Sequence, residues 1–336
     1  MRLKFWMGIL ISVVFLYFFS REINWIEVWR NIKSIHYAYL PLVVFLHMAV
    51  YVLRAQRWRY LLEHLKKISL FRMFSATMIG FMANNILPFR LGEIAKAYVV
   101  GQREGISKSA SLATVVVERL FDALVILMFL IGIMLFFPFP RGFEQNKIIN
   151  PYSLKLAATL STGLCVGIIL FLVIARLYFQ KMRNVLGKIL LPRFPHFHEK
   201  LIAAIGSFVS GLDSLSRGGH MVSVIIYSVL IWLMISLTFY GLYPAFNIQL
   251  PYSSAILMAV VVAVGVAVPS SPGFVGTFHL ACASCLILLD IEPNKAKSFA
   301  LILHGVIFVP VTVMGLLFVY FDKIDLKQIK SLENAK

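Results

Sequence analysis

Apolar runs of membrane-spanning length recur along the whole chain, and they constrain the fold more than any other feature. Of the 336 residues, 60% are hydrophobic and only 14% are charged, whereas about a quarter of the residues in a soluble domain are charged. Because about 20 consecutive apolar residues predict a transmembrane helix, we expect an all-α, polytopic helical membrane protein. Little polar sequence separates the runs, so residues 1–336 should form one integral-membrane domain. The runs cover residues 5–19, 38–53, 73–88, 109–137, 154–175, 220–243, 252–268, 274–289 and 299–321.

Basic residues predict the side of the membrane on which each loop lies. The stretches 54–72 and 176–200 each hold six Lys or Arg residues against one acidic residue, and such loops usually face the cytoplasm. We also expect both chain termini to lie in the cytoplasm and the protein to lie in the plasma (inner) membrane. The formal net charge of +17 then reflects contact with anionic headgroups. No basic stretch interleaves with exposed aromatic residues, so nucleic acid is not an expected partner.

The number of runs between the two basic loops predicts a segment that does not cross the membrane. Three apolar runs separate these loops, yet only an even number of crossings returns the chain to the same side. The runs 109–137 and 154–175 are long and apolar, so we expect 73–88 to enter the membrane, break near Pro88 and return through 91–106. About six full spans remain.

The second half of the chain contains a similar interruption in the opposite sense. Residues 252–268 lead into Pro269-Ser-Ser-Pro-Gly273, and residues 274–289 follow. A re-entrant hairpin and two full crossings are both compatible with the predicted side of the C-terminus. Two broken helix pairs, entering from opposite sides, suggest the inverted-repeat plan of many transporters.

The first polar motif lies at the first break, in the stretch NNILPFRLGEIAKA. Proline interrupts a helix, glycine allows close backbone approach, and the arginine suits a phosphate group. Irregular backbone at membrane depth is tolerated where it lines protein or a wet cavity. An ordinary cytoplasmic loop with a local ion pair is the alternative. The candidate headgroup ligands are Asn85, Arg90, Gly92, Glu93 and Lys96.

The second motif places three ionisable residues inside a predicted span, at Glu118, Arg119 and Asp122. Each unpaired charge at mid-membrane costs about 2.5–3.5 kcal/mol, so these side chains should be paired, lie near the interface or face a wet cavity. We expect Arg119 to pair with Asp122, and Glu118 to face Arg90 or Lys96. A purely structural ion-pair clamp between helices is the alternative.

The third motif, PSSPGFVGTFH, interrupts the run 252–289 with prolines and glycines. It is typical of an unwound hairpin tip with exposed backbone amides, and a histidine there titrates near neutral pH or donates a hydrogen bond. A helix–helix hydrogen bond is the more ordinary role for a membrane histidine. No pattern predicts a metal or cofactor. The candidate binding residues are Ser270, Ser271, Gly273, Gly276 and His279.

Together the three motifs resemble the flippase-like membrane domain, also called the lysylphosphatidylglycerol synthase transmembrane region. His279 stands where many members carry an acidic residue, and Lys96 stands where arginine is frequent. The aminoacyltransferase domain of some members has no counterpart here, so the resemblance does not imply synthase chemistry. The motifs that carry it are Asn85-x-x-Pro88-x-Arg90-x-Gly92-Glu93-x-x-Lys96, Val116-Val117-Glu118-Arg119-x-x-Asp122 and Pro269-Ser270-Ser271-Pro272-Gly273-x-x-Gly276-Thr277-Phe278-His279.

The resemblance implies lipid translocation rather than catalysis. The expected ligand is a phosphate-bearing lipid, either an anionic phospholipid or a polyprenyl phosphate, bound in an intramembrane polar cavity. A scaffold for a lipid-modifying enzyme or for a glycosyltransferase of a polyprenyl-linked glycan pathway is one alternative. A membrane glycosyltransferase is another, although loop 20–37 offers only Glu22 and Glu27 as carboxylates.

Overall fold

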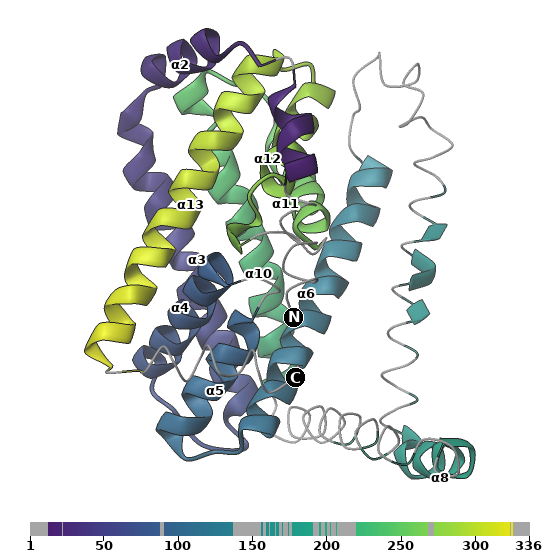
Figure 1. The fold of residues 1–336 in the computed structure, drawn as a ribbon. Coiled ribbons are helices and arrows are strands. Elements are labelled where there is room, and N and C mark those ends of the chain that lie inside the picture. Colours follow the sequence, from purple (N-terminus) through teal and green to yellow (C-terminus); the bar gives the residue numbers. More distant parts are fainter. Residues whose placement is uncertain are drawn as a thin grey trace.

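The computed structural model describes most of the helical bundle. It covers residues 13–21, 23–87, 91–136, 177–190, 220–267, 272–322 and 324, with scattered positions between 156 and 206. Every regular element within these ranges is a helix (Figure 1), which confirms the all-α prediction. Among the described residues, four helical segments are long and apolar enough to cross a membrane: Tyr37–Leu62, Lys108–Phe136, His220–Phe246 and Pro293–Phe321.

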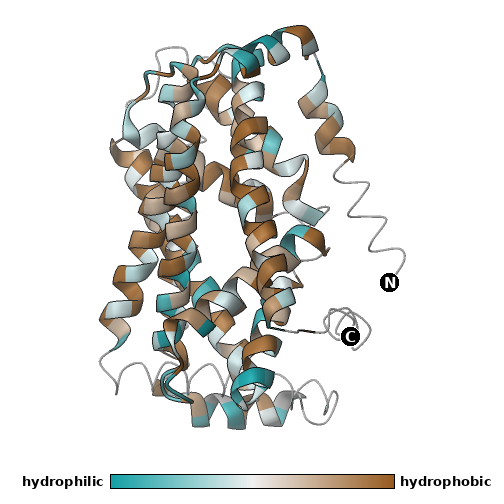
Figure 2. Ribbon diagram, turned by 90° about the vertical axis from the view of Figure 1, so that its left-hand side faces the viewer, coloured by the Kyte–Doolittle hydropathy of each residue, from teal (hydrophilic) through white to brown (hydrophobic). Residues whose placement is uncertain are grey.

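These segments contain the helices α3 (Leu40–Leu62), α6 (Lys108–Phe136), α10 (His220–Gly241) and α13 (Pro293–Phe321). The 3₁₀ turns Tyr37–Tyr39 and Pro244–Phe246 extend the first and third. In Figure 2 the long helices are brown along most of their length, and many teal residues gather at the ends of the bundle. The predicted spans 5–19 and 154–175 lie largely outside the described residues.

The first broken pair is a re-entrant hairpin of α4 (Leu70–Ile86) and α5 (Gly92–Glu104). Its two open ends meet, because Glu104 at the end of α5 pairs with Arg72 at the start of α4 at 3.1 Å. Gly92 makes the close approach that its sequence position suggested: a Cβ atom there would lie 1.8 Å from the carbonyl oxygen of Gly80. The expectation that this segment enters and returns on one side is therefore confirmed.

The second broken pair is also re-entrant, and this decides between the two possibilities left by the sequence. It consists of α11 (Tyr252–Ala267), the 3₁₀ turn η4 (Pro272–Phe274) and α12 (Thr277–Leu288). Lys295 after the hairpin donates to the carbonyl of Asn247 before it at 3.3 Å, so both open ends lie at the same end of the bundle. Gly273 and Gly276 adopt positive φ angles of 69° and 91°, which glycine tolerates best.

The helix lengths repeat in order along the chain. Helices α3, α4, α5 and α6 contain 23, 17, 13 and 29 residues, and α10, α11, α12 and α13 contain 22, 16, 12 and 29. The packing repeats as well, because α6 packs against α11 and α10 just as α13 packs against α4 and α3. The described core therefore consists of two similar halves.

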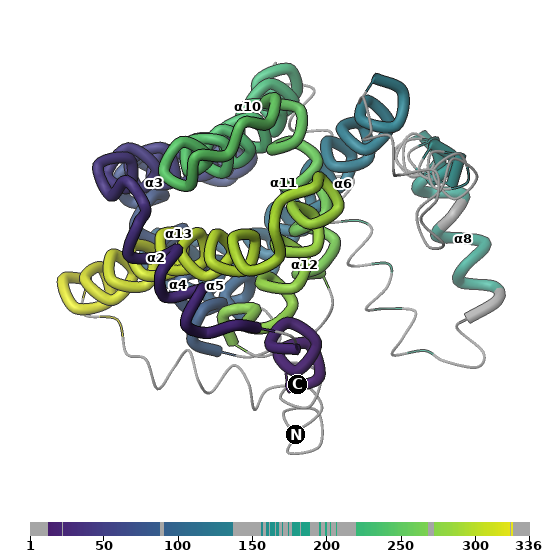
Figure 3. The backbone as a smooth tube through the Cα atoms, turned by 90° about the horizontal axis from the view of Figure 1, so that it is seen from above, coloured from purple at the N-terminus to yellow at the C-terminus, as the bar shows by residue number. Residues whose placement is uncertain are grey.

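The two halves run in opposite senses. Glu63 just after α3 contacts His220 at the start of α10 at 3.0 Å. At the other end, the backbone of His36 donates to the carbonyl of Ala245 at 3.1 Å, so α3 and α10 are antiparallel neighbours. Figure 3 shows this pair side by side, with α13 beside α12. The inverted repeat inferred from topology is thus present in the helix packing.

A short amphipathic helix precedes the core of each half: α2 (Trp25–Ser34) and α8 (Phe179–Leu190). Asn24 caps α2 by accepting from the backbone N–H groups of Ile26 and Glu27. Trp25, Ile26 and Trp29 of α2 are exposed, which suits a helix lying in the membrane interface. In Figure 1, α2 lies across the upper end of the bundle and α8 at the lower end.

Candidate functional site

A cluster of charged side chains, most of them buried, lies where α3, α5 and α6 meet. Two arginines spaced i, i+3 on α3 face two carboxylates spaced i, i+4 on α6, because residues at these spacings share one side of a helix. A third element, α5, adds a lysine and a glutamate. The cluster consists of Arg54, Arg57, Glu93, Lys96, Glu118, Arg119 and Asp122.

Asp122 lies at the centre of one side of this cluster. Its Oδ1 atom accepts from Arg57 Nη1 at 2.7 Å and from the indole of Trp232 at 3.3 Å. Its Oδ2 atom contacts Arg119 Nη2 at 3.1 Å and Arg54 Nη1 at 3.5 Å. A carboxylate at this depth is therefore fully compensated by cations, as the cost of an unpaired charge in the membrane requires.

Glu118 lies at the centre of the other side. It forms an ion pair with Lys96 and contacts Arg57 Nη2 at 3.4 Å. The Lys96 ammonium also lies 4.1 Å from the ring centroid of Trp58, a cation–π contact. The indole of Trp58 in turn donates to Thr114 at 2.9 Å, so both partners of the ion pair are held in place by neighbouring side chains.

The tips of the two hairpins meet in the middle of the bundle, against α13. Asn85 on α4 donates to the hydroxyl of Thr312 at 2.8 Å and to the carbonyl of Phe308 at 3.4 Å. His304 on α13 contacts the carbonyl of Gly273 on the second tip at 2.9 Å. The same helix therefore holds both tips with hydrogen bonds.

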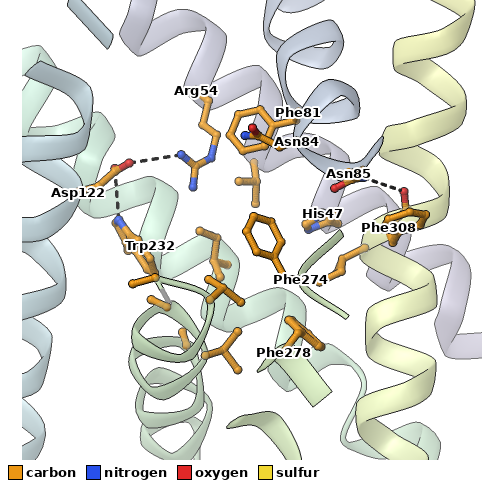
Figure 4. A pocket seen from close by; sticks show the side chains of 18 of the residues that line it. His47, Arg54, Phe81, Asn84, Asn85, Asp122, Trp232, Phe274, Phe278 and Phe308 are labelled. Atoms are coloured by element: carbon orange, nitrogen blue, oxygen red, sulfur yellow. Dashed lines mark hydrogen bonds and ion pairs between the residues drawn. The ribbon is translucent and has the colours of Figure 1, made fainter. Parts of the chain in front are cut away.

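A cavity of about 460 Å³ lies between these tips and the buried charges. In Figure 4, Arg54 and Asp122 lie on one side of it, and Phe274 and Phe278 on the other. Most of its wall is apolar. Its polar and charged lining residues are His47, Tyr51, Arg54, Asn84, Asn85, Glu93, Arg119, Asp122, Trp232 and His304.

Comparison with known proteins identifies the family. The family model described as the lysylphosphatidylglycerol synthase TM region matches residues 5–315. The chain belongs to this family. It is therefore an integral membrane protein, and the resemblance of the three motifs is confirmed at the level of the family.

Individual relatives share about a quarter of their residues with this chain. A UPF0104 membrane protein of Methanothermobacter thermautotrophicus is 23% identical over 309 residues, which cover 88% of each chain. The UPF0104 membrane protein MJ1078 of Methanocaldococcus jannaschii is 24% identical over 253 residues, covering 75% of this chain and 98% of the relative. No solved structure matches the chain significantly. These likenesses support a membrane protein and name no substrate.

The structure shows where most of the predicted ligands from the three motifs lie relative to the cavity. Asn85, Glu93, Arg119, Asp122 and Gly273 line the cavity. The expected Arg119–Asp122 contact and the expected approach of Glu118 to Lys96 are both present. Arg90, Ser270 and Ser271, which we predicted as ligands, lie outside the described residues.

Several other predicted ligands lie near the cavity without lining it. Lys96 and Glu118 bind each other behind its wall. The backbone N–H of Gly276 donates to His279 Nδ1 at 3.3 Å, and the His279 ring packs 4.5 Å from that of His304. The backbone N–H of Gly92 donates to Asn84 Oδ1 at 2.8 Å, and neighbouring atoms leave no room for a Cβ atom at this position. These contacts give all five residues a structural place next to the site.

The predicted location of two arginines of α3 was wrong. We assigned Arg54 and Arg57 to a cytoplasmic loop, but α3 continues to Leu62, and the two residues are 8% and 0% exposed. The assignment was wrong because a count of basic residues does not reveal that Asp122 and Glu118 neutralise them inside the bundle. The i, i+3 spacing of two arginines after an apolar helix was the available signal.

Proposed function

We propose that the protein binds the phosphate-bearing headgroup of a membrane lipid in the central cavity and moves that lipid across the bilayer. The observation that supports this most is the position of the cavity, which lies where two oppositely entering hairpins meet. In transporters built from inverted repeats, substrates bind at such a midpoint. The guanidinium of Arg54 on the cavity wall supplies a ligand for phosphate.

The chemistry of the lining suits a headgroup with its lipid tails outside. A phosphate group in bare hydrocarbon is costly because nothing replaces its hydration. Arginine side chains and the Asn84 and Asn85 amides, all on the cavity wall, would replace part of that hydration. A volume of about 460 Å³ is within the usual range of small-molecule sites and is too small for two long acyl chains, which would remain in the bilayer.

The hairpin tips supply a means of changing access. Hydrogen bonds connect each tip to α13, from Asn85 to Thr312 and from His304 to Gly273. Breaking one set while keeping the other would open the cavity toward one side, because the two hairpins enter from opposite ends. The direction of movement and a lipid-modifying or glycosyltransferase partner stay predictions, as do the plasma-membrane location and the cytoplasmic termini.

Filling the cavity tests this function. Ala263 of α11 lines it, whereas the next residue, Val264, does not and is 58% exposed. In liposomes containing fluorescent phospholipid, movement between leaflets is measured by the fraction of probe that a membrane-impermeant reductant bleaches. We expect Ala263→Phe to stop the protein-dependent movement and Val264→Phe to leave it unchanged.

The controls distinguish transport from leak and from misfolding. Protein-free liposomes give the background rate, and size-exclusion chromatography of each variant establishes that it is folded. Movement at the background rate for the unmodified protein contradicts the proposed function. Equal movement by Ala263→Phe and Val264→Phe would show that lipids pass by a route other than this cavity.

A further inference from the structure

The buried charge cluster is unbalanced by one positive charge among the described residues. It contains four cations, on Arg54, Arg57, Lys96 and Arg119, and three carboxylates, on Glu93, Glu118 and Asp122. Arg119 and Glu93 are partly exposed and contact each other, so the buried members carry the same excess of one positive charge. Burial makes such an excess costly, because little water screens it. A ligand with one negative charge would remove the excess.

Arg54 carries the charge that is least satisfied. Arg57 reaches Asp122 at 2.7 Å, Glu118 at 3.4 Å and the hydroxyl of Ser228 at 2.9 Å. Among the described residues, in contrast, the one carboxylate contact of Arg54 is with Asp122 Oδ2 at 3.5 Å, an oxygen that Arg119 approaches more closely. The remaining N–H groups of Arg54 are therefore available to a ligand.

The position of Arg54 directs it to the cavity. Its guanidinium lies 5.2 Å from the ring centroid of Phe81 and forms part of the cavity wall. Figure 4 shows it between Asp122 and Asn84 and close to the open space. A planar guanidinium held this way can offer two parallel N–H groups to two oxygens of one phosphate.

Two further polar groups lie on the same face of α3. His47, Tyr51 and Arg54 have i, i+4 and i, i+7 spacings, and all three line the cavity. His47 is 8% exposed, and within the described part of the chain neither of its ring nitrogens makes a well-formed hydrogen bond, only a marginal contact with the backbone of Ile307. We call these three residues the α3 stripe.

We propose that the α3 stripe binds a lipid phosphodiester that carries one net negative charge and no cationic group, with Arg54 on the phosphate oxygens and His47 on a neutral polar part of the headgroup. This inference rests on the proposed function and narrows its substrate class. A zwitterionic headgroup with a primary ammonium is disfavoured because that ammonium finds no free carboxylate. Both carboxylates on the cavity wall, Glu93 and Asp122, already pair with Arg119.

Transport selectivity tests the charge argument. Liposomes carry the protein with fluorescent phosphatidylglycerol, a monoanion, or with fluorescent phosphatidylethanolamine, a zwitterion with a primary ammonium and the same tails. We expect the monoanion to move about tenfold faster or more, which corresponds to about 1.4 kcal/mol. Arg54→Gln removes the excess charge, so the two rates should converge, whereas Arg54→Lys should keep a preference at a lower rate. Arg59→Gln removes a charge from the same helix outside the cavity and should change neither rate.

A binding measurement separates this inference from the transport proposal. The melting temperature of the detergent-solubilised protein is measured with each lipid added, since a ligand stabilises the state that binds it. Selective stabilisation by phosphatidylglycerol that Arg54→Gln abolishes supports the α3 stripe even if no lipid moves. The inference is overturned if both lipids move and stabilise equally, or if Arg54→Gln keeps the preference. Inorganic phosphate tests whether the site binds a free phosphate ion instead of a lipid headgroup. If it stabilises the protein as well as the lipid does, the ligand is not specifically a lipid.

Discussion

Glu118 offers the sharpest test of how the buried charges hold the helices together. Its side chain is 1% exposed and bridges Lys96 of α5 and Arg57 of α3. Glu118→Gln keeps the size of the side chain and removes only its charge. Arg57 then keeps Asp122 at 2.7 Å, but Lys96 keeps only the face of the Trp58 ring.

The expected loss of stability follows from leaving Lys96 without its carboxylate. Removing one partner of a buried ion pair costs about 3–5 kcal/mol, because the remaining charge is neither paired nor hydrated. The double variant Lys96→Met with Glu118→Gln removes both charges, so we expect it to regain most of this loss. Lys67→Gln breaks a pair with Glu63 in which Lys67 is 88% exposed, and exposed pairs contribute about 0–1 kcal/mol.

Unfolding by SDS in mixed detergent micelles, followed by tryptophan fluorescence, gives the difference in unfolding free energy. We expect the unfolding free energy of Glu118→Gln to be far below that of the unmodified protein. The double variant should lie between these two values or equal the unmodified protein, and Lys67→Gln should be unchanged. A Glu118→Gln protein within about 1 kcal/mol of the original would refute the claim that this pair is buried and unscreened. A double variant as unstable as Glu118→Gln would show that Lys96 is not the residue left unpaired.

Two further predictions concern the hairpins. Asn85→Ala should lower the unfolding free energy by about 0.5–1.5 kcal/mol, because its hydrogen bond to Thr312 is lost. When it is combined with Thr312→Val in the same SDS titration, the two effects should be less than additive. Full additivity would argue against the contact. Gly92→Ala should cost about 1–3 kcal/mol or more, because its methyl group would collide with the backbone of Gly80. Gly132→Ala, where a Cβ meets open space, is the matched control, and equal yields of folded protein from the two variants would contradict the close packing.

The hairpins could be predicted from the sequence because loop charges and helix breakers are local signals. The stretches 54–72 and 176–200 required an even number of crossings, and the break near Pro88 showed which segment turns back. The second hairpin remained ambiguous at that stage, since both arrangements satisfied the count. The contact of Lys295 with Asn247 decides it, and nothing local to either residue indicates that contact.

The candidate site was predicted in part, for a related reason. Glu118 and Asp122 stand out because carboxylates are rare in apolar helices, so their need for partners was evident. The partners Arg54 and Arg57 were missed because they follow an apolar run and resemble the basic residues that flank many spans. Asn85 was identified as polar, but its acceptor Thr312 lies 227 positions away. Long-range pairing of this kind depends on packing and leaves no periodic pattern in the sequence.

The antiparallel match of the two halves affects how the chain enters a membrane. Helices of nearly equal length, arranged in opposite senses, give the bundle a similar outline whichever end points outward. Shape alone therefore cannot decide the sense of insertion, and the difference in charge between the two ends has to. One end carries Lys66, Arg72 and Arg103 with the carboxylates of Glu104 and Asp322, and the other carries Glu27, Glu292 and Lys295. By the positive-inside rule, we expect the basic residues near the helix ends, rather than the buried cluster, to set the sense of insertion.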